Sequence, residues 1–153
     1  MSAYADIETA ISEAVKALLV ANVAEAFQAD CPVVTFYDPM SIDEANRCVV
    51  QVPECQPAQE HAGNFEATVE VGIKAQWAQA SVAEDLASHN ARCRAFRSVL
   101  LSNTLAEEIE AQAGGKFSVW FVNPEKQMRT EVRENWYYSP TIFKIQGGFL
   151  EAA

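Results

Sequence analysis

Residues Asn64–Trp77 read NFEATVEVGIKAQW, with apolar side chains at every second position. Successive side chains of a strand point to opposite faces of a sheet, so this alternation predicts one strand with a dry face and a wet face. At about 3.3 Å per residue the strand would extend roughly 46 Å, whereas strands usually have about five or six residues. A strand of this length bends or extends beyond its own domain. In a chain of this size it favours assembly with other copies over enclosure of a substrate.

The composition predicts a single globular domain over residues 1–153. Half of the residues are hydrophobic and 21% are charged, which excludes disorder as the overall state. The longest apolar stretch in the first predicted helix, Ala17–Ala21, is far shorter than the roughly 20 residues of a membrane span. No basic region precedes an apolar one at the N-terminus, so we expect no signal peptide and a location in the cytosol of the producing cell.

The charge of the chain is unevenly distributed. The net charge is −10, which argues against tight nucleic-acid binding because that affinity comes mostly from neutralised phosphates. Residues 1–91 hold 3 basic and 14 acidic side chains, whereas residues 92–153 hold 8 basic and 7 acidic ones. Electrostatically unlike surfaces would favour head-to-tail contacts between copies. An equally good interpretation is that the acidic groups serve only to keep a small protein soluble.

The cysteines and histidines give little support for a metal site or a cofactor. The four cysteines form no C-x-x-C pair. His89 and Cys93 stand four residues apart on one helical face, with His61 as a further candidate ligand, but this is no established ligand pattern. We therefore interpret the cysteines as buried structural thiols in a reducing compartment and expect no bound metal or cofactor.

Hydrophobic periodicity predicts an α+β fold: a mixed, mainly antiparallel sheet with an N-terminal and a central helix packed on one face, in the order α-β-β-β-α-(α)-β-β. Pro140 restricts the last strand to a sheet edge or a bulge. The predicted helices are 4–27, a second one from 82 that breaks at 102–104, and 104–113, which ends at Gly114-Gly115. The predicted strands are 33–37, 47–52, 64–77, 117–122 and 136–145, with loops at 53–63 and 123–134 and a flexible tail at 146–153.

No catalytic pattern occurs in the chain. Phosphate-binding glycine loops, a G-x-S-x-G elbow and an H-E-x-x-H helix are all missing. His61 lies in a predicted loop without a nucleophile beside it, and His89 lies on the apolar stripe of a predicted helix, where a core histidine is the better interpretation. Adjacent carboxylates such as Glu107-Glu108 do not face each other on a helix. We expect a protein that is not an enzyme.

The candidate functional residues are instead interface residues. Positive charge gathers in the loop 123–134 of an otherwise acidic chain, where it can contact an acidic neighbour or DNA phosphates, or simply be solvated. Aromatic residues near strand ends are enriched at protein interfaces, although many belong to cores. The wet face of the long strand carries carboxylates. The predicted interface residues are Lys126, Arg129, Arg133, Trp136, Trp77, Glu66 and Glu70.

Most of the chain resembles a known family. The first helix, a short pair of strands and the long alternating strand are followed by a helix containing His89–Leu101, a glycine-containing turn and the aromatic strand Trp136-Tyr137-Tyr138. This order in an acidic chain of about this length resembles the tail-terminator and tail-completion (neck) proteins of long-tailed bacteriophages. The resemblance implies an α+β fold and a homohexameric ring that caps the tail tube and joins it to the head connector or stopper protein. It implies no catalytic residues.

In that role the protein would be a structural virion protein, located at the neck and assembled in the host cytoplasm. Genomic DNA would pass through the ring without specific binding, and carboxylates of residues 1–91 would line the channel and keep DNA from sticking. Two alternatives remain open. The first is another neck component, such as a head-completion or stopper protein. The second is a small metabolite-binding α+β domain with His89 and Cys93 near a pocket.

Overall fold

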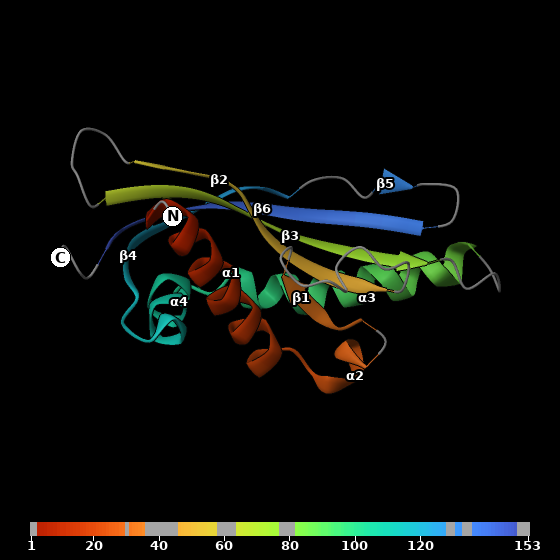
Figure 1. The fold of residues 1–153 in the computed structure, drawn as a ribbon. Helices are drawn as coiled ribbons and strands as arrows, with labels where there is room; N and C mark the ends of the chain where they lie inside the picture. Colours follow the sequence, from red (N-terminus) through yellow and green to blue (C-terminus); the bar gives the residue numbers. More distant parts are fainter. Residues whose placement is uncertain are drawn as a thin grey trace.

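The computed structural model describes residues 3–29, 31–35, 46–57, 64–76, 82–127, 131–132 and 136–149. Four helices and six strands lie in these ranges (Figure 1). The helices are α1 (Ala3–Asn22), α2 (Glu25–Gln28), α3 (Val82–Leu100) and α4 (Leu105–Ala113). The strands are β1 (Val33–Thr35), β2 (Arg47–Pro57), β3 (Asn64–Gln76), β4 (Phe117–Gln127), β5 (Glu131–Val132) and β6 (Trp136–Phe149).

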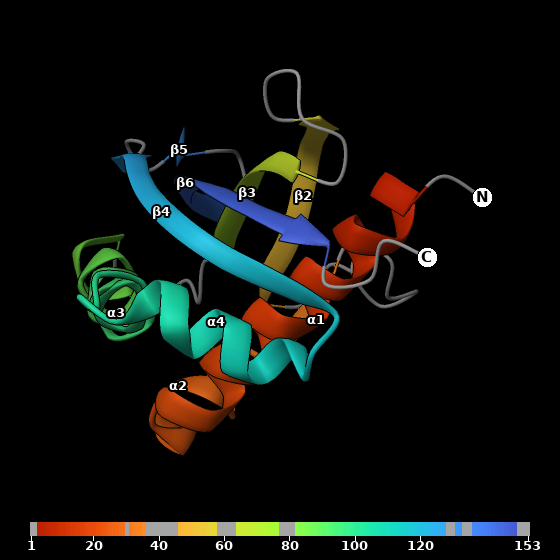
Figure 2. The same ribbon diagram turned by 90° about the vertical axis from the view of Figure 1, so that its left-hand side faces the viewer.

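The strands form one mixed sheet in the order β1-β2-β3-β6-β4, and β5 also pairs with β6. Only the β1–β2 pairing is parallel, and the others are antiparallel. The helices α1, α3 and α4 lie on one side of the sheet, and no described helix covers the other side (Figure 2). The predicted α+β class, with helices packed on one face of a mainly antiparallel sheet, is confirmed.

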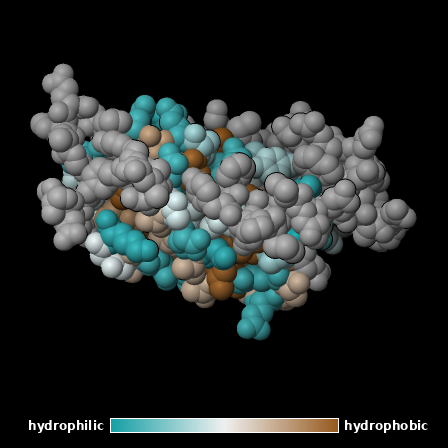
Figure 3. All heavy atoms as spheres, in the orientation of Figure 1, coloured by the Kyte–Doolittle hydropathy of each residue, from teal (hydrophilic) through white to brown (hydrophobic). Residues whose placement is uncertain are grey.

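The long strand is present, and its alternation sets the two faces of the sheet. In β3 every odd-numbered residue from Phe65 to Ala75 is buried. All of these side chains except Ala75 belong to one core cluster with the apolar stripe of α1, which includes Ile11, Val15 and Leu19. All thirteen residues of β3 have a partner in β6, so the strand is supported along its whole length. Over the helical part of the molecule, Figure 3 shows hydrophobic and hydrophilic residues interspersed at the described surface.

The first helix is shorter than predicted. A single helix over residues 4–27 was expected, but α1 ends at Asn22 and a short α2 follows. Ala24 has an extended backbone between them (φ −57°, ψ 139°). The side-chain amide of Gln28 donates to the carbonyl oxygens of Val20 (3.1 Å) and Val23 (2.6 Å). These bonds satisfy acceptors that the end of a helix leaves without an intrahelical partner, and so stabilise the break.

The predicted end of α4 is confirmed, and its start lies one residue after the predicted 104. The segment 102–104 separates α3 from α4, and Gly114 ends α4 in a left-handed conformation (φ 61°) that glycine adopts without steric cost.

Two predicted loops are partly strand. The first five residues of the loop predicted at 53–63 belong to β2, which continues to Pro57 after a register shift between Gln51 and Glu54. The first five residues of the segment 123–134 belong to β4. Pro124 is tolerated there because β4 lies at the sheet edge and its register shifts between Pro124 and Lys126.

The prediction that Pro140 confines its strand to an edge or a bulge is wrong. β6 lies between β3 and β4, and Pro140 pairs with Gly72. On the other side of β6, the β4 pairing ends at Thr141 and the β5 pairing begins at Tyr138. Pro140 therefore lies between these two pairings, where β6 has no described neighbour on that side. Proline is tolerated at this position because it has no backbone N–H to donate to a neighbouring strand. The tail predicted from residue 146 is also wrong for residues 146–149: residues 146–148 pair with both β3 and β4, and Phe149 pairs with β4.

Candidate functional site

The uncovered face of the sheet carries a polar network centred on Glu70. Its carboxylate accepts a hydrogen bond from Gln51 of β2 (2.6 Å) and one from the hydroxyl of Tyr138 of β6 (2.7 Å). Gln51 is directly opposite Glu70 in the register, whereas Tyr138 is opposite Lys74. The network therefore joins the three neighbouring strands β2, β3 and β6. Its bonds are strong ones, because hydrogen bonds to a charged acceptor are stronger than neutral ones.

Gly72 allows Tyr138 to reach Glu70. Along β3 it lies between Lys74, the register partner of Tyr138, and Glu70. A Cβ atom at this position would overlap the Tyr138 ring and hydroxyl. The glycine is buried although it lies on the uncovered face. The ring occupies the space that a side chain would fill, which explains the glycine within an otherwise well-formed strand.

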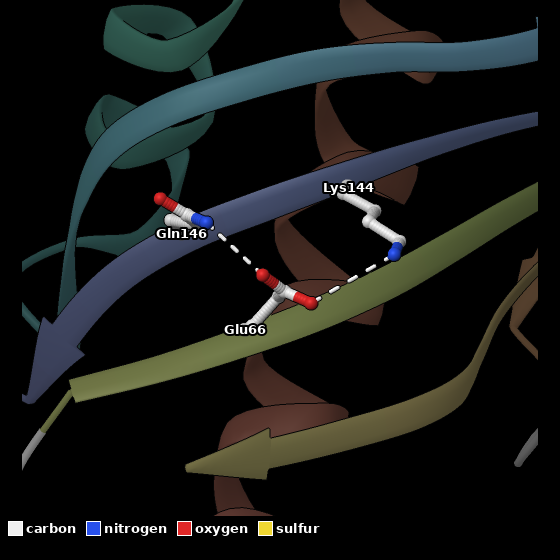
Figure 4. Close-up of polar contacts among 3 residues, drawn as sticks. All are labelled: Glu66, Lys144 and Gln146. Atoms are coloured by element: carbon white, nitrogen blue, oxygen red, sulfur yellow. Dashed lines mark hydrogen bonds and ion pairs between the residues drawn. The ribbon is translucent and has the colours of Figure 1, made fainter. Parts of the chain in front are cut away.

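A second group of polar contacts surrounds Glu66. Gln146, its direct register partner in β6, donates to the Glu66 carboxylate at 3.0 Å. The Lys144 ammonium lies 3.8 Å from the other carboxylate oxygen. Figure 4 shows the three side chains pointing toward one another on the sheet face opposite α1. Ion pairs this exposed contribute about 0–1 kcal/mol, so the group fixes side-chain positions more than it stabilises the fold.

A groove with large exposed hydrophobic side chains at its rim lies at the β4 edge. Its cavity of about 360 Å³ is bounded by the end of α3, the α3–α4 connection, the start of α4 and β4. Three large hydrophobic side chains at its rim are more than half exposed: Leu101 (65%), Trp120 (58%) and Phe121 (52%). The lining residues are Leu100, Leu101, Ser102, Asn103, Leu105, Ala106, Trp120, Phe121 and Val122.

A bulge in β4 brings the two aromatic residues to the surface. The register of β4 against β6 shifts between Val119 and Phe121, so Trp120 is the extra residue. Its indole lies against Gly148, where an added Cβ would be 2.8 Å from the ring. Just before the bulge, the backbone N–H of Val119 donates to the carboxylate of Glu110 on α4 (2.7 Å). Helix α4 thus provides an acceptor for one backbone N–H at the start of this sheet edge. After the bulge, β4 borders the groove instead.

A buried polar cluster lies between α3 and β6. His89 Nε2 is 2.8 Å from Ser139 Oγ and 3.4 Å from Cys93 Sγ, and the imidazole stacks on Tyr137 with ring centroids 5.4 Å apart. Burial, with smaller contributions from Arg92 and Arg97, lowers the pKa of His89 from 6.5 to about 4. The imidazole is therefore neutral at pH 7, and the prediction of a core histidine is confirmed.

The cysteines are free, and three of them, Cys31, Cys48 and Cys93, are buried as predicted. Burial is the main cause that raises the pKa of Cys48 and Cys93. For the half-buried Cys55, burial and then the nearby Glu8 raise the pKa to about 12. At neutral pH these three are thiols rather than the nucleophilic thiolates.

The structure describes only part of the predicted interface. Trp77, Arg129 and Arg133 lie outside the described residues. Lys126 and Trp136 occupy positions in β4 and β6, and their side chains are outside the description. Glu66 and Glu70 lie on the uncovered face, as predicted from the alternation of β3. They are in separate groups, so the structure does not bring them to one site.

The sequence interpretation missed two features. The polar partners of the glutamates, Gln51, Tyr138, Lys144 and Gln146, were not predicted, because cross-strand register is not visible in the sequence. The groove was also missed. The available signal was the pair Trp120-Phe121, two adjacent large apolar residues that break the alternation of a strand and so mark a bulge.

Comparison with protein-family models gave no match, and comparison with curated proteins gave none either. Within the described ranges, no helix is long and apolar enough to cross a membrane. The same ranges contain no group of three or more histidine, cysteine, aspartate or glutamate side chains placed to hold a metal ion.

Proposed function

We propose that this chain is a self-assembling structural subunit of a bacteriophage neck, a tail terminator that forms a ring, caps the tail tube and docks it to the head connector or stopper protein. The observation that supports it best is the surface of the sheet. No described helix covers one face, and one edge exposes Trp120 and Phe121 beside a groove. Exposed apolar patches with adjacent aromatic residues are typical of protein interfaces.

The charge distribution is consistent with a channel for DNA. The surplus of carboxylates lies in residues 1–91, and Glu54, Glu66 and Glu70 are described members of it in β2 and β3. A ring that turned acidic surface toward its channel would repel DNA phosphates and let DNA slide. In this function the virion is the site of action, and the host cytoplasm is the site of assembly.

Light scattering coupled to size exclusion tests the proposal. A homohexamer would have six times the subunit mass of 16.8 kDa, and negative-stain images would show rings. A matched pair of variants locates the surface: Phe121→Ser removes an exposed aromatic residue at the groove, whereas Val20→Ser removes an exposed apolar residue of α1. We expect the first to weaken assembly and the second to leave it unchanged. A monomer at high concentration would contradict the proposal.

A binding assay distinguishes the possible neck positions. A tail terminator binds the ends of purified tail tubes, whereas a head-completion or stopper protein binds DNA-filled capsids that lack tails. Gold-labelled protein incubated with each particle should label the tube ends. Labelling of the capsid vertex alone would assign the chain to the other neck components.

The groove also supports the metabolite-binding alternative. Its volume of about 360 Å³ lies within the range of roughly 300–1,000 Å³ that ligand pockets occupy, and Ser102 and Asn103 supply polar groups. His89 and Cys93 do not line it, so that part of the earlier hypothesis is wrong for this cavity. A thermal-shift screen with common metabolites is the test. A bound ligand at one hundred times its Kd would stabilise the protein by about 2.7 kcal/mol.

A further inference from the structure

In the residues that the structure describes, the sheet has two edges without a partner strand, on opposite sides. On one side, β1 pairs only with Cys48–Val50, so the half of β2 from Gln51 to Pro57 has no described strand beyond it. On the other side, β4 ends the sheet and has no described strand on its outer edge. Uncovered edges present backbone donors and acceptors that can pair with another chain.

The two edges have compatible directions. Three successive antiparallel pairings, β2–β3, β3–β6 and β6–β4, make β4 run opposite to β2. A second copy related by rotation about an axis along the strands would place its β2 beside β4 of the first copy. The new pair would also be antiparallel, so the alternation of strand directions would continue without interruption from one copy to the next.

The groove supplies an apolar centre for this contact. Aromatic side chains bury about 150–250 Å² each, so the exposed fractions of Trp120 and Phe121 leave roughly 200 Å² to be covered. A standard interface buries about 800 Å² on each partner. The two aromatics alone supply about a quarter of that area, and Leu101 and the strand pairing add to it.

Charge favours unlike edges over like ones. The half of β2 from Gln51 to Pro57 carries Glu54 and no basic residue, and it belongs to the part of the chain whose net charge is −11. The strand β4 carries Glu125 and Lys126, which balance, and it lies in the part of the chain whose net charge is +1. A two-fold pairing of the β2 half with itself would bring Glu54 of both copies to one edge, whereas a head-to-tail pairing places that half beside β4, which has no net charge.

From these observations we infer that a second copy of this chain occupies the β4 edge, with its β2 half Gln51–Pro57 added to β4 and the groove at the centre of the contact. The inference rests on the proposed ring and names the surfaces that close it. Because the contact is heterologous, the number of copies follows from the rotation between neighbours.

Disulfide trapping tests the pairing. Glu54 and Asn123 are both exposed and lie in one cross-strand row, Glu54–Thr68–Lys144–Asn123, so a continued sheet brings them to the same level in neighbouring copies. The double variant Glu54→Cys/Asn123→Cys is made in a Cys55→Ala background, which removes the only native thiol that is not buried. Disulfides need Cα atoms about 4.4–6.8 Å apart. A second double variant, Glu54→Cys/Phe121→Cys, covers a register that is shifted by two residues.

The inference predicts a ladder of covalent multimers after mild oxidation of one double variant, ending at the mass of the ring, while each single variant stays at the mass of one chain. A covalent dimer of the single Asn123→Cys variant would show two-fold β4 pairing and overturn the inference. A ring by light scattering without a ladder from either double variant would overturn the inference and leave the proposed function standing. A monomer by light scattering would overturn both.

Discussion

Substituting Gly72 by alanine tests the architecture of the uncovered face. Both positive-φ glycines of the described chain lie elsewhere, at Gly114 and Gly115, so the backbone at Gly72 accepts alanine without strain. The obstacle is the Tyr138 ring, which the new Cβ would overlap. The ring must move away, and the hydrogen bond from its hydroxyl to Glu70 (2.7 Å) is then lost.

The expected effect combines three contributions. A hydrogen bond to a charged group contributes about 1.5–3 kcal/mol. Overpacking typically costs about 1–3 kcal/mol. This cost includes the displacement of the Tyr138 ring, so it is not fully additive with the cost of the lost hydrogen bond. Alanine regains about 0.4–1 kcal/mol by reducing the entropy of the unfolded chain. We therefore expect Gly72→Ala to lower the free energy of unfolding by about 1–2 kcal/mol, or Tm by roughly 2–8 °C for a chain of this size.

Urea unfolding at one fixed protein concentration measures the effect, since assembly makes apparent stability depend on concentration. The matched control is Gly148→Ala. There the Cβ would be 2.8 Å from the far end of Trp120, which is 58% exposed and can turn into solvent, so we expect a smaller loss. In a Tyr138→Ala background the ring is gone, and Gly72→Ala should cost nothing. An equal cost of Gly72→Ala in both backgrounds would refute the reasoning.

Three further predictions concern other parts of the fold. The pKa of His89 in the folded protein (about 4) is below its ordinary value of 6.5, so the full stabilisation by the neutral form is present above pH 6.5. About 3 kcal/mol of the free energy of unfolding should be lost as the pH falls to 4. Urea unfolding at a series of pH values measures this loss, and an equal loss in a His89→Gln variant would contradict the prediction. Gly147→Ala places a Cβ against the backbone carbonyl of Ser118, which cannot turn away, so calorimetry should show a larger loss than for Gly72→Ala. Glu66→Gln removes an exposed ion pair with Lys144 and should change the free energy of unfolding by less than about 1 kcal/mol, so a loss above 2 kcal/mol would show that we underestimate this contact.

Local patterns in the sequence predicted the layers of the fold well. The alternation in β3 and the helical stripe of α1 each show which face of the element is apolar. That face is the one buried against a partner in the structure. The end of α4 at Gly114 was also predicted, because a glycine that adopts the left-handed conformation can end a helix whatever its tertiary contacts are.

The extent of the strands was predicted less well, because pairing partners decide it. The strands β2, β4 and β6 all continue into segments predicted as loop or tail. Each is held there by pairing with a neighbouring strand: the end of β2 pairs with β3, the next strand in the chain, whereas the end of β6 pairs with the distant β3 as well as with β4. Pro140 is a similar case: a proline in a central strand looks unfavourable until the gap between its partners β4 and β5 is known.

The sequence by itself therefore determined the α+β class, the dry and wet faces of the long strand, the core position of His89 and the uneven charge. All of these are properties of single elements or of composition. Only the tertiary structure decided that Tyr138 reaches Glu70 across Gly72, that a bulge exposes Trp120 and Phe121, and that these aromatics border a groove with Leu101. Such contacts depend on cross-strand register and on the packing of distant elements, which are fixed when the whole chain folds.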